Sequence, residues 1–460
     1  MILPCGGRAE KERTLDHLER AQDVIEKALK MGGEDVDVYI EETREIELVV
    51  RNGEMEKVRR SHSKGLGLTI IKDKRPGFSY TSNLSPEYLA EIIKKTVGFS
   101  LIADPVPWLA LAEDDGRKPA DLDIWDPSIA QVEEKTKIDK LKTVEKIALS
   151  SDQRIRNSEG GVYKDRETEI VVANSNGVSR KSKSSYVSFG VNVIAEEAGQ
   201  MKYGSWTSAK RHFRDLDGEE NVAAKAVKRA VDKLGARPVA TQKKPVLIDR
   251  YAASLFWQGI LWALEGERAL QRTTFLADSL YKQVTAKFIT LMDDPTIPRH
   301  VASVPFDGEG RTTRKNLLIE QGKLGMFLYD TTAARRAGIE GNTIARRDGY
   351  KNMPSGGFLN AVVQNGNAKL SEMIKGIDEG IYVTELRGIG TDIPSGSFSV
   401  GATGFFIDKG AVAFPVDAMT LGGNTLEILK GIEQVADDLD MRGNINSPSF
   451  KVSEMTIGGK

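Results

Sequence analysis

The stretch that most constrains the fold of this chain is residues 379–424, in which nine residues are glycine. Short runs of β-branched and aromatic residues lie between the glycines, a pattern typical of strands separated by turns. Asp408, Lys409 and Gly410 separate two such runs and predict a hairpin. Glycines inside strands indicate bulges or backbones that approach closely. The stretch therefore predicts a tightly packed antiparallel sheet.

At 460 residues the chain exceeds the size of one ordinary core, so several domains are expected. We place an N-terminal α+β domain at 1–112, a middle α+β region packed with it at 113–240, and a mainly-β C-terminal domain at 241–460. Four prolines among acidic residues at 103–128 indicate a boundary or an extended arm. The predicted fold class is α+β, with antiparallel meanders and helices followed by a mainly-β domain with a few helices.

The charges of the chain almost cancel, with 65 Lys and Arg against 66 Asp and Glu. This balance provides no field that would attract nucleic acid. The single cysteine, Cys5, excludes an intrachain disulfide and fits a reducing cytoplasm. No apolar run reaches the 18 residues that a membrane-spanning helix requires. We therefore predict a cytoplasmic protein with neither nucleic-acid nor membrane partners.

Local sequence patterns predict where individual helices and hairpins lie. Apolar periodicity predicts a helix at 14–31 with Thr14 as its cap. The pairs Asn52-Gly53 and Asn176-Gly177 each predict a hairpin between alternating strands. Further helices are expected at 85–97, 128–150, 218–234, 252–265 and 425–439.

The glycine spacing near the C-terminus has a counterpart in a known family. The run at 396–405, followed by Gly410 and Gly423-Asn424, resembles the C-terminal block of the TldD/PmbA proteins. These were named as modulators of DNA gyrase and are understood as subunits of a metallopeptidase. The resemblance covers most of the chain, is weakest before residue 35 and in 103–128, and points to the PmbA (TldE) branch.

In catalytic TldD-type members, a helix carries His-Glu-x-x-x-His ahead of a Leu-Glu-Gly-acid run, which residues 264–267 match here. Counting back, both histidine positions hold tryptophan, Trp257 and Trp262, and the general-base position holds Gln258. An indole offers a metal no lone pair, and an amide takes no proton at neutral pH. The family's cysteine ligand has no counterpart after Cys5. The resemblance thus implies a chain without catalytic residues, metal or cofactor of its own.

The residue types alone lead to the same expectation, because a catalytic zinc needs about three histidine, cysteine or carboxylate ligands. The histidines lie in different predicted elements: His17, His62, His212 and His300. We expect them to be surface or satisfied core residues. The carboxylates that come nearest to a ligand set are Glu265, Glu267, Asp307 and Glu309. We expect these to be solvated or capping charges. The loops at 308–311 and 346–347 carry groups that suit a peptide carboxylate, although a structural role is the simpler interpretation.

The two tryptophans are five residues apart, about 140° around a helix. We expect one in the core and the other toward an interface, so that indole fills the former metal cleft. Replacing Trp262 with alanine should then cost about 3–5 kcal/mol.

The predicted function is a non-catalytic subunit that pairs with a TldD-like catalytic chain, which would hold the zinc. The pair would act on unfolded or leader peptides, and a glycine-rich sheet offers backbone edges to an extended peptide by strand addition. The alternative is an autonomous peptidase, or a peptide-binding homodimer, with an unrecognised site. A test of whether the chain alone cleaves peptide would distinguish these two hypotheses.

Overall fold

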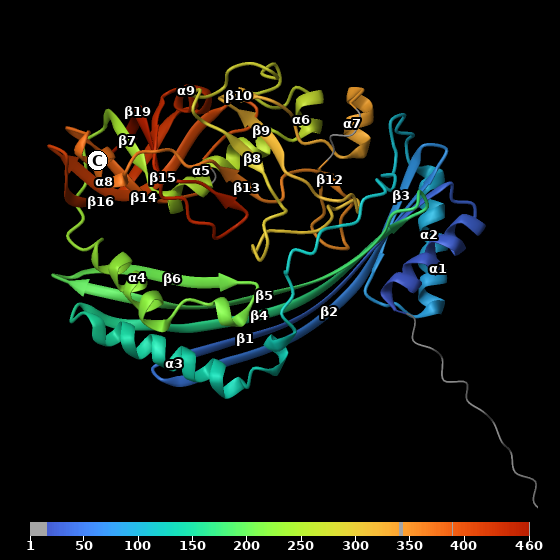
Figure 1. The fold of residues 1–460 in the computed structure, drawn as a ribbon, viewed down its shortest axis with the longest axis horizontal. Coiled ribbons are helices and arrows are strands. Elements are labelled where there is room, and N and C mark those ends of the chain that lie inside the picture. Colours follow the sequence, from blue (N-terminus) through green and yellow to red (C-terminus); the bar gives the residue numbers. More distant parts are fainter. Residues whose placement is uncertain (1–15, 340–343, 389, 460) are drawn as a thin grey trace, which may run out of the picture.

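A long curved sheet holds the C-terminal half of the chain on its concave side (Figure 1). The structure is a computed structural model that describes residues 16–339, 344–388 and 390–459. The sheet is antiparallel throughout, in the order β3-β2-β1-β4-β5-β6. Its strands are β1 (Asp35–Arg51), β2 (Glu54–Lys72), β3 (Arg75–Thr81), β4 (Ile155–Asn174), β5 (Ser179–Glu197) and β6 (Gln200–Lys210).

Two pairs of helices cover opposite ends of one face of this sheet. The first pair is α1 (His17–Lys30) and α2 (Pro86–Ile102), and the second is α3 (Glu134–Ser151) and α4 (Glu219–Val231). Both pairs pack on even-numbered residues of β1, with Val36, Val38 and Ile40 in one core and Leu48 and Val50 in the other. Alternation along a strand therefore leaves the opposite face free to meet the C-terminal half.

The centre of the long sheet is polar and is not covered by either helix pair. Cross-strand pairs stabilise it: Arg166 Nη2 lies 2.6 Å from Glu45 Oε2, and Lys57 Nζ lies 2.8 Å from Glu47 Oε1. Because residues 41–45 carry so much charge, the alternating runs on either side of them resemble separate strands in the sequence. They are one strand, β1, which runs without a break.

The predicted hairpins are confirmed, because the turn residues adopt the left-handed backbone that such turns require. Asn52 and Gly53 have φ of 54° and 74°, and Lys409 and Gly410 have φ of 49° and 73°. Gly177, with φ of 92°, lies between β4 and β5.

The helix predicted at 14–31 is α1, whose first residues differ from the expectation. Thr14 lies outside the described residues. Asp16 is the N-cap: its side chain accepts from the Glu19 N–H at 2.8 Å, and Glu19 Oε2 accepts from the Asp16 N–H at 3.1 Å. This reciprocal pair is a capping box, which satisfies two N–H groups at the start of the helix.

The C-terminal half contains two further sheets. The larger has the order β16-β15-β14-β7-β19-β17, and β16 also pairs with β19 at 420–422, which closes the sheet on itself at one end. The other has the order β10-β9-β8-β13-β18. The strands of the larger sheet are β7 (Gln242–Ile248), β14 (Glu379–Arg387), β15 (Ser397–Asp408), β16 (Ala411–Asn424), β17 (Ile432–Val435) and β19 (Phe450–Gly458).

The remaining elements are short, apart from α5 (Arg250–Ala263). The strands of the five-stranded sheet are β8 (Leu291–Asp293), β9 (Asn316–Glu320), β10 (Lys323–Leu324), β13 (Ala361–Val363) and β18 (Ile445–Asn446). β11 (Ala345–Arg346) pairs with β12 (Ser355–Gly356). The other helices are α6 (Gly266–Leu270), α7 (Thr331–Ala337), α8 (Leu370–Lys375) and α9 (Thr425–Lys430), with 3-10 turns at Pro127–Gln131 and Phe213–Asp215. Among the described residues, no helix has both the length and the apolar character needed to cross a membrane.

The fold class is α+β with a mainly-β C-terminal half, as predicted. The strands within 379–424 pair antiparallel, as expected, and β7 joins them in parallel through β14. Two local expectations are wrong. The helix expected at 425–439 ends at Lys430, because the residues after Gly431 pair with β19 as strand β17. The helix expected at 128–150 begins only at Glu134, after a 3-10 turn that Pro127 starts.

Gly404 provides a test of how tightly β14 and β15 approach each other. A Cβ at Gly404 would lie 2.0 Å from the Tyr382 carbonyl oxygen, whereas a Cβ at Gly401, in the same strand, would lie 3.5 Å from its nearest neighbour. We expect Gly404→Ala to lower the free energy of unfolding by about 2–3 kcal/mol and Gly401→Ala to change it by less than about 1 kcal/mol. Urea denaturation measures both, and equal costs would contradict the close approach.

Candidate functional site

Helix α5 carries the positions that the resemblance assigns to catalysis. It follows β7 directly and is capped by Asp249, whose side chain accepts from the Tyr251 N–H at 2.9 Å. The helix lies between the two C-terminal sheets, so most of its circumference is apolar and buried. Its buried residues are Ala252, Ala253, Phe256, Trp257, Gly259, Ile260, Leu261 and Ala263.

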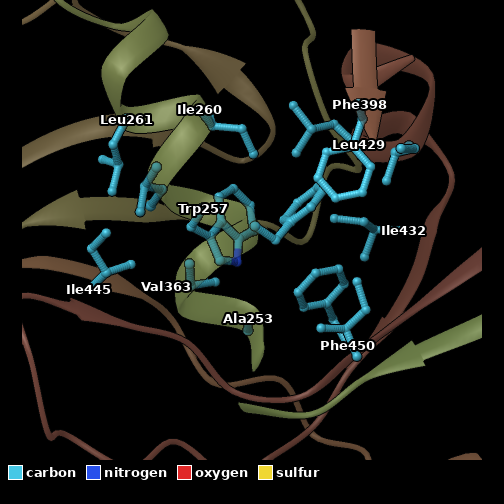
Figure 2. Packing of buried hydrophobic residues seen from close by; sticks show 14 of the residues in the cluster. Ala253, Trp257, Ile260, Leu261, Val363, Phe398, Leu429, Ile432, Ile445 and Phe450 are labelled. Atoms are coloured by element: carbon cyan, nitrogen blue, oxygen red, sulfur yellow. The ribbon is translucent and has the colours of Figure 1, made fainter. Parts of the chain in front are cut away.

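Trp257 lies at the centre of the C-terminal core and is 0% exposed (Figure 2). Its ring packs edge-on against Phe256, with centroids 5.6 Å apart, and against Phe450 at 6.0 Å. The indole Nε1–H donates to Ser447 Oγ at 3.1 Å. The only polar atom of this side chain is therefore already used, and it is a donor.

Trp262 and Gln258 lie on the outer side of α5 and are only partly buried. One tryptophan is thus in the core and the other at its margin. Trp262 packs at the edge of the core, whereas the fully buried side of α5 runs through Trp257, about 140° away. We therefore assign the larger packing energy to Trp257 instead of Trp262.

A polar pocket of about 420 Å³ adjoins Gln258. One wall is the outer side of α5, including Arg250 and Tyr251, and the other is the segment 440–446. The Tyr251 hydroxyl donates to Asp440 Oδ2 at 3.0 Å, and Arg250 Nη1 donates to the Asp438 carbonyl at 2.8 Å. These bonds fix the two walls to each other.

Arg442 connects this pocket to the long sheet. Its guanidinium lies 3.7 Å from the centroid of the Trp206 ring, and it donates to the carbonyl of Thr207. Trp206 in turn packs edge-on against Tyr251 at 4.9 Å. Because Trp206 and Thr207 belong to β6, the pocket lies beside the edge strand of the long sheet.

The residues around α5 do not fit a zinc ion. Trp257 faces the core without a lone pair, Gln258 offers an amide, and Asp440 is the one acidic residue lining the pocket. Across the described ranges, no three or more His, Cys, Asp or Glu residues are grouped so that they could hold a metal.

The structure brings two of the histidines together. His17 Nε2 lies 2.6 Å from Glu42 Oε2 and His62 Nε2 lies 2.7 Å from Glu42 Oε1. Burial opposes the charge of Glu42, but the hydrogen bonds with both histidines outweigh it and lower its pKa to about 2. His212 Nε2–H donates to the Asp123 carbonyl, 2.9 Å away, and His300 is buried. None of these four histidines lines the pocket beside α5.

The four carboxylates considered as possible ligands differ in their exposure to solvent. Glu265 pairs with Arg268 at 2.6 Å and Glu267 with Arg336 at 2.7 Å, both partly exposed. The other two, Asp307 and Glu309, are buried, so of the two expected roles, solvated or capping charge, they have the second.

Backbone N–H groups take the place of water around the buried pair. Asp307 accepts from the N–H groups of Glu309, Arg311 and Ala345 at 2.9–3.1 Å. Glu309 accepts from the N–H of Thr331 at 3.2 Å and from its hydroxyl at 2.7 Å. Burial raises the pKa of both carboxyl groups above their ordinary values, and the nearby Asp307 raises the pKa of Glu309 further.

A second, smaller pocket of about 240 Å³ adjoins Asp307 and also contains Asp293, which the sequence analysis did not single out. Asp293 is 0% exposed and lies at the end of β8. Its Oδ1 accepts from the N–H groups of Leu359 and Asn360 at 2.9 and 2.6 Å, whereas Oδ2 has no hydrogen-bond partner. Burial raises the pKa of Asp293 from 3.8 to about 6.

Hydrogen bonds connect the linings of the two pockets at one end of the five-stranded sheet. Asn360, which donates its N–H to Asp293, accepts at Oδ1 from Asn446 Nδ2 at 3.2 Å. Asn446 lines the pocket beside α5. Asn360, through its backbone N–H on one side and its side chain on the other, therefore links Asp293 to Asn446.

Alanine substitutions can show which of the two tryptophans of α5 contributes more to stability. Trp257→Ala should lower the free energy of unfolding by about 3–5 kcal/mol, because it opens a cavity in the core and leaves Ser447 without its donor. Trp262→Ala should cost less than half as much, because the side chain is only partly buried. Chemical denaturation measures both, and a larger loss for Trp262→Ala would refute the assignment.

The buried charge of Asp293 makes stability depend on pH. Its pKa is about 6 in the folded chain and about 3.8 when unfolded, so the folded state binds more protons and loses stability as the pH rises from 4 to 6. Asp293→Asn removes this loss and should stabilise the chain by about 1–3 kcal/mol at pH 7 and by almost nothing at pH 4. The control is Asp294→Asn, whose carboxylate accepts from Thr296. Unfolding curves at both pH values test this, and a pH-independent gain would contradict it.

Three domain models of one family match the chain: PmbA/TldA metallopeptidase domain 1 at 36–98, the central domain at 127–234 and the C-terminal domain at 241–459. Metalloprotease PmbA of Escherichia coli O157:H7 is 29% identical over 457 residues, which cover 97% of this chain and 99% of that protein. The metalloprotease PmbA homolog of Buchnera aphidicola subsp. Acyrthosiphon pisum is 30% identical over 428 residues, 92% of this chain and 93% of that one. The crystal structure of TldE from Thermococcus kodakarensis, at 24% identity, shares the fold with a TM-score of 0.85 over 96% of this chain and 100% of its own. The chain belongs to the PmbA/TldD metallopeptidase family.

Proposed function

We propose that this chain is the non-catalytic subunit of a TldD/TldE-type metallopeptidase and that a TldD-like partner chain holds the zinc. The observation that carries the proposal is the environment of α5. The position expected for the first histidine holds a core indole, and the position of the general base holds Gln258, an amide. Neither supplies a metal ligand or a base.

The role of the chain in the pair is to bind an unfolded or leader peptide. The pocket beside Gln258 has donors and acceptors on both walls, and Arg442 places it next to β6, an edge strand. An extended peptide that pairs with an edge strand gains main-chain hydrogen bonds whatever its sequence. We prefer β6 to the glycine-rich strands near the C-terminus for this role, because the pairing of β16 with β19 reduces the free edge there.

The names of the relatives favour a second candidate function. Proteins called metalloprotease PmbA align with this chain over almost its full length. An autonomous peptidase, or a peptide-binding homodimer with its own site, is therefore the alternative. Both candidates place the protein in the cytoplasm, which suits a chain whose single cysteine cannot form an intrachain disulfide.

Reconstitution tests the proposal. The chain is purified alone and together with a TldD-like chain from the same genome that has an intact His-Glu-x-x-x-His, and cleavage of an unfolded fluorogenic peptide is followed. We expect no cleavage by this chain alone and chelator-sensitive cleavage by the pair. Gln258→Glu in this chain should confer no activity on it alone, because the base of a metallopeptidase acts on a metal-bound water and this helix offers no metal ligands.

The matched control changes the glutamate of the partner's motif to glutamine, which should abolish cleavage by the pair. Chelator-sensitive cleavage by this chain alone, in a preparation free of the partner, would overturn the proposal and favour the autonomous enzyme.

A further inference from the structure

The smaller pocket, next to Asp293, has the features of a built binding site. It lies where the segment after α2 crosses the C-terminal half, with Asp115 and Arg117 on one side and Asp293, Asp307 and Arg311 on the other. Arg117 is exposed, so the pocket opens to solvent at that residue. Its volume of about 240 Å³ is below the range of about 300–1,000 Å³ typical of sites for drug-sized ligands, which indicates a smaller ligand.

One end of the pocket offers an unused acceptor. Asp293 is 0% exposed, and its Oδ1 is fixed by two backbone N–H groups, whereas Oδ2 has no partner. Leaving a buried carboxylate oxygen unpaired is costly. The other two carboxylates are already satisfied, because Asp307 accepts from three backbone N–H groups and Asp115 accepts from both the N–H and the hydroxyl of Thr312.

The pocket also offers unused donors. The Nε of Arg311 is buried without a hydrogen-bond partner, and among the described residues neither Arg311 nor Arg117 forms an ion pair. The two lining groups with a buried atom that lacks a hydrogen-bond partner, Asp293 and Arg311, carry opposite charges, which favours a ligand that carries both signs.

We propose that this pocket binds a free α-amino acid, with its ammonium group at Asp293 Oδ2 and its carboxylate at the guanidinium groups of Arg311 and Arg117. The ammonium supplies the donor that Asp293 lacks, and a guanidinium pairs well with a carboxylate. A simple anion would leave Asp293 unpaired, and a simple cation would leave Arg311 unpaired. This site is separate from the α5 pocket and does not depend on the proposed peptidase role.

Calorimetric titration of the whole chain with glycine, L-alanine, L-leucine and L-lysine tests the proposal. We expect at least one of them to bind with a dissociation constant below 10 mM, on the order expected for so few contacts. The N-acetylated and the amidated forms of that amino acid should each bind at least tenfold more weakly, because each lacks one of the two charges. Failure of all four amino acids to bind overturns the proposal.

Two variants locate the site. Asp293→Asn keeps an oxygen for the two backbone N–H groups and places an NH₂ where Oδ2 was, so the ammonium is repelled and affinity should fall at least tenfold. Arg311→Gln should weaken binding by a similar factor through the carboxylate. Asp294→Asn removes the same charge one residue away, outside the lining, and should leave affinity unchanged.

The thermal unfolding midpoint, measured with and without the amino acid, checks that each variant is folded. If one variant fails to fold, the other variant and the blocked ligands still decide the outcome. Binding that survives both substitutions, or that tolerates both blocked forms, shows that the amino acid binds elsewhere and rejects this site.

Discussion

The burial of Trp257 between the two C-terminal sheets is the constraint on which the rest of this half depends. A side chain of this size, 0% exposed and joined to Ser447, fixes the rotation of α5 about its own axis. That rotation decides which residues reach solvent, and it places Gln258 on the wall of the pocket beside β6. Packing therefore sets the chemistry available on α5, which presents an amide to the pocket and holds in the core an indole without a lone pair for a metal.

The parts of the fold that could be predicted from the sequence are those encoded by neighbouring residues. Asn52-Gly53 and Lys409-Gly410 specify their turns through positive φ angles that few other residues tolerate. The helix beginning at His17 follows from its apolar periodicity. The end of α9 was not predictable in this way, because Ile432 fits a helical period as well as a strand and the choice is made by pairing with β19.

Interactions between distant segments decide what the sequence could not reveal. The polar residues at 41–45 resemble a loop, and only their partners on β2 and β4 make them part of one strand. Asp307 and Glu309 resemble solvated charges, yet N–H groups from Ala345 and Thr331, more than 20 residues away, allow them to be buried. In both cases the residue type is informative only once its partner is known.

Asp293 likewise owes its environment to segments distant in the sequence. Nothing in the local pattern distinguishes it from Asp294, which caps a turn at Thr296. Its position at the end of β8, opposite the start of β13, gives it two backbone donors for one oxygen and leaves the other oxygen free. Asn360 lies between it and Asn446, across two strand spacings or about 10 Å. A ligand that pairs with Asp293 would therefore act on the same hydrogen-bonded chain that ends beside α5. This end of the five-stranded sheet is where the polar chemistry of the C-terminal half is concentrated, away from the indole that fills its core.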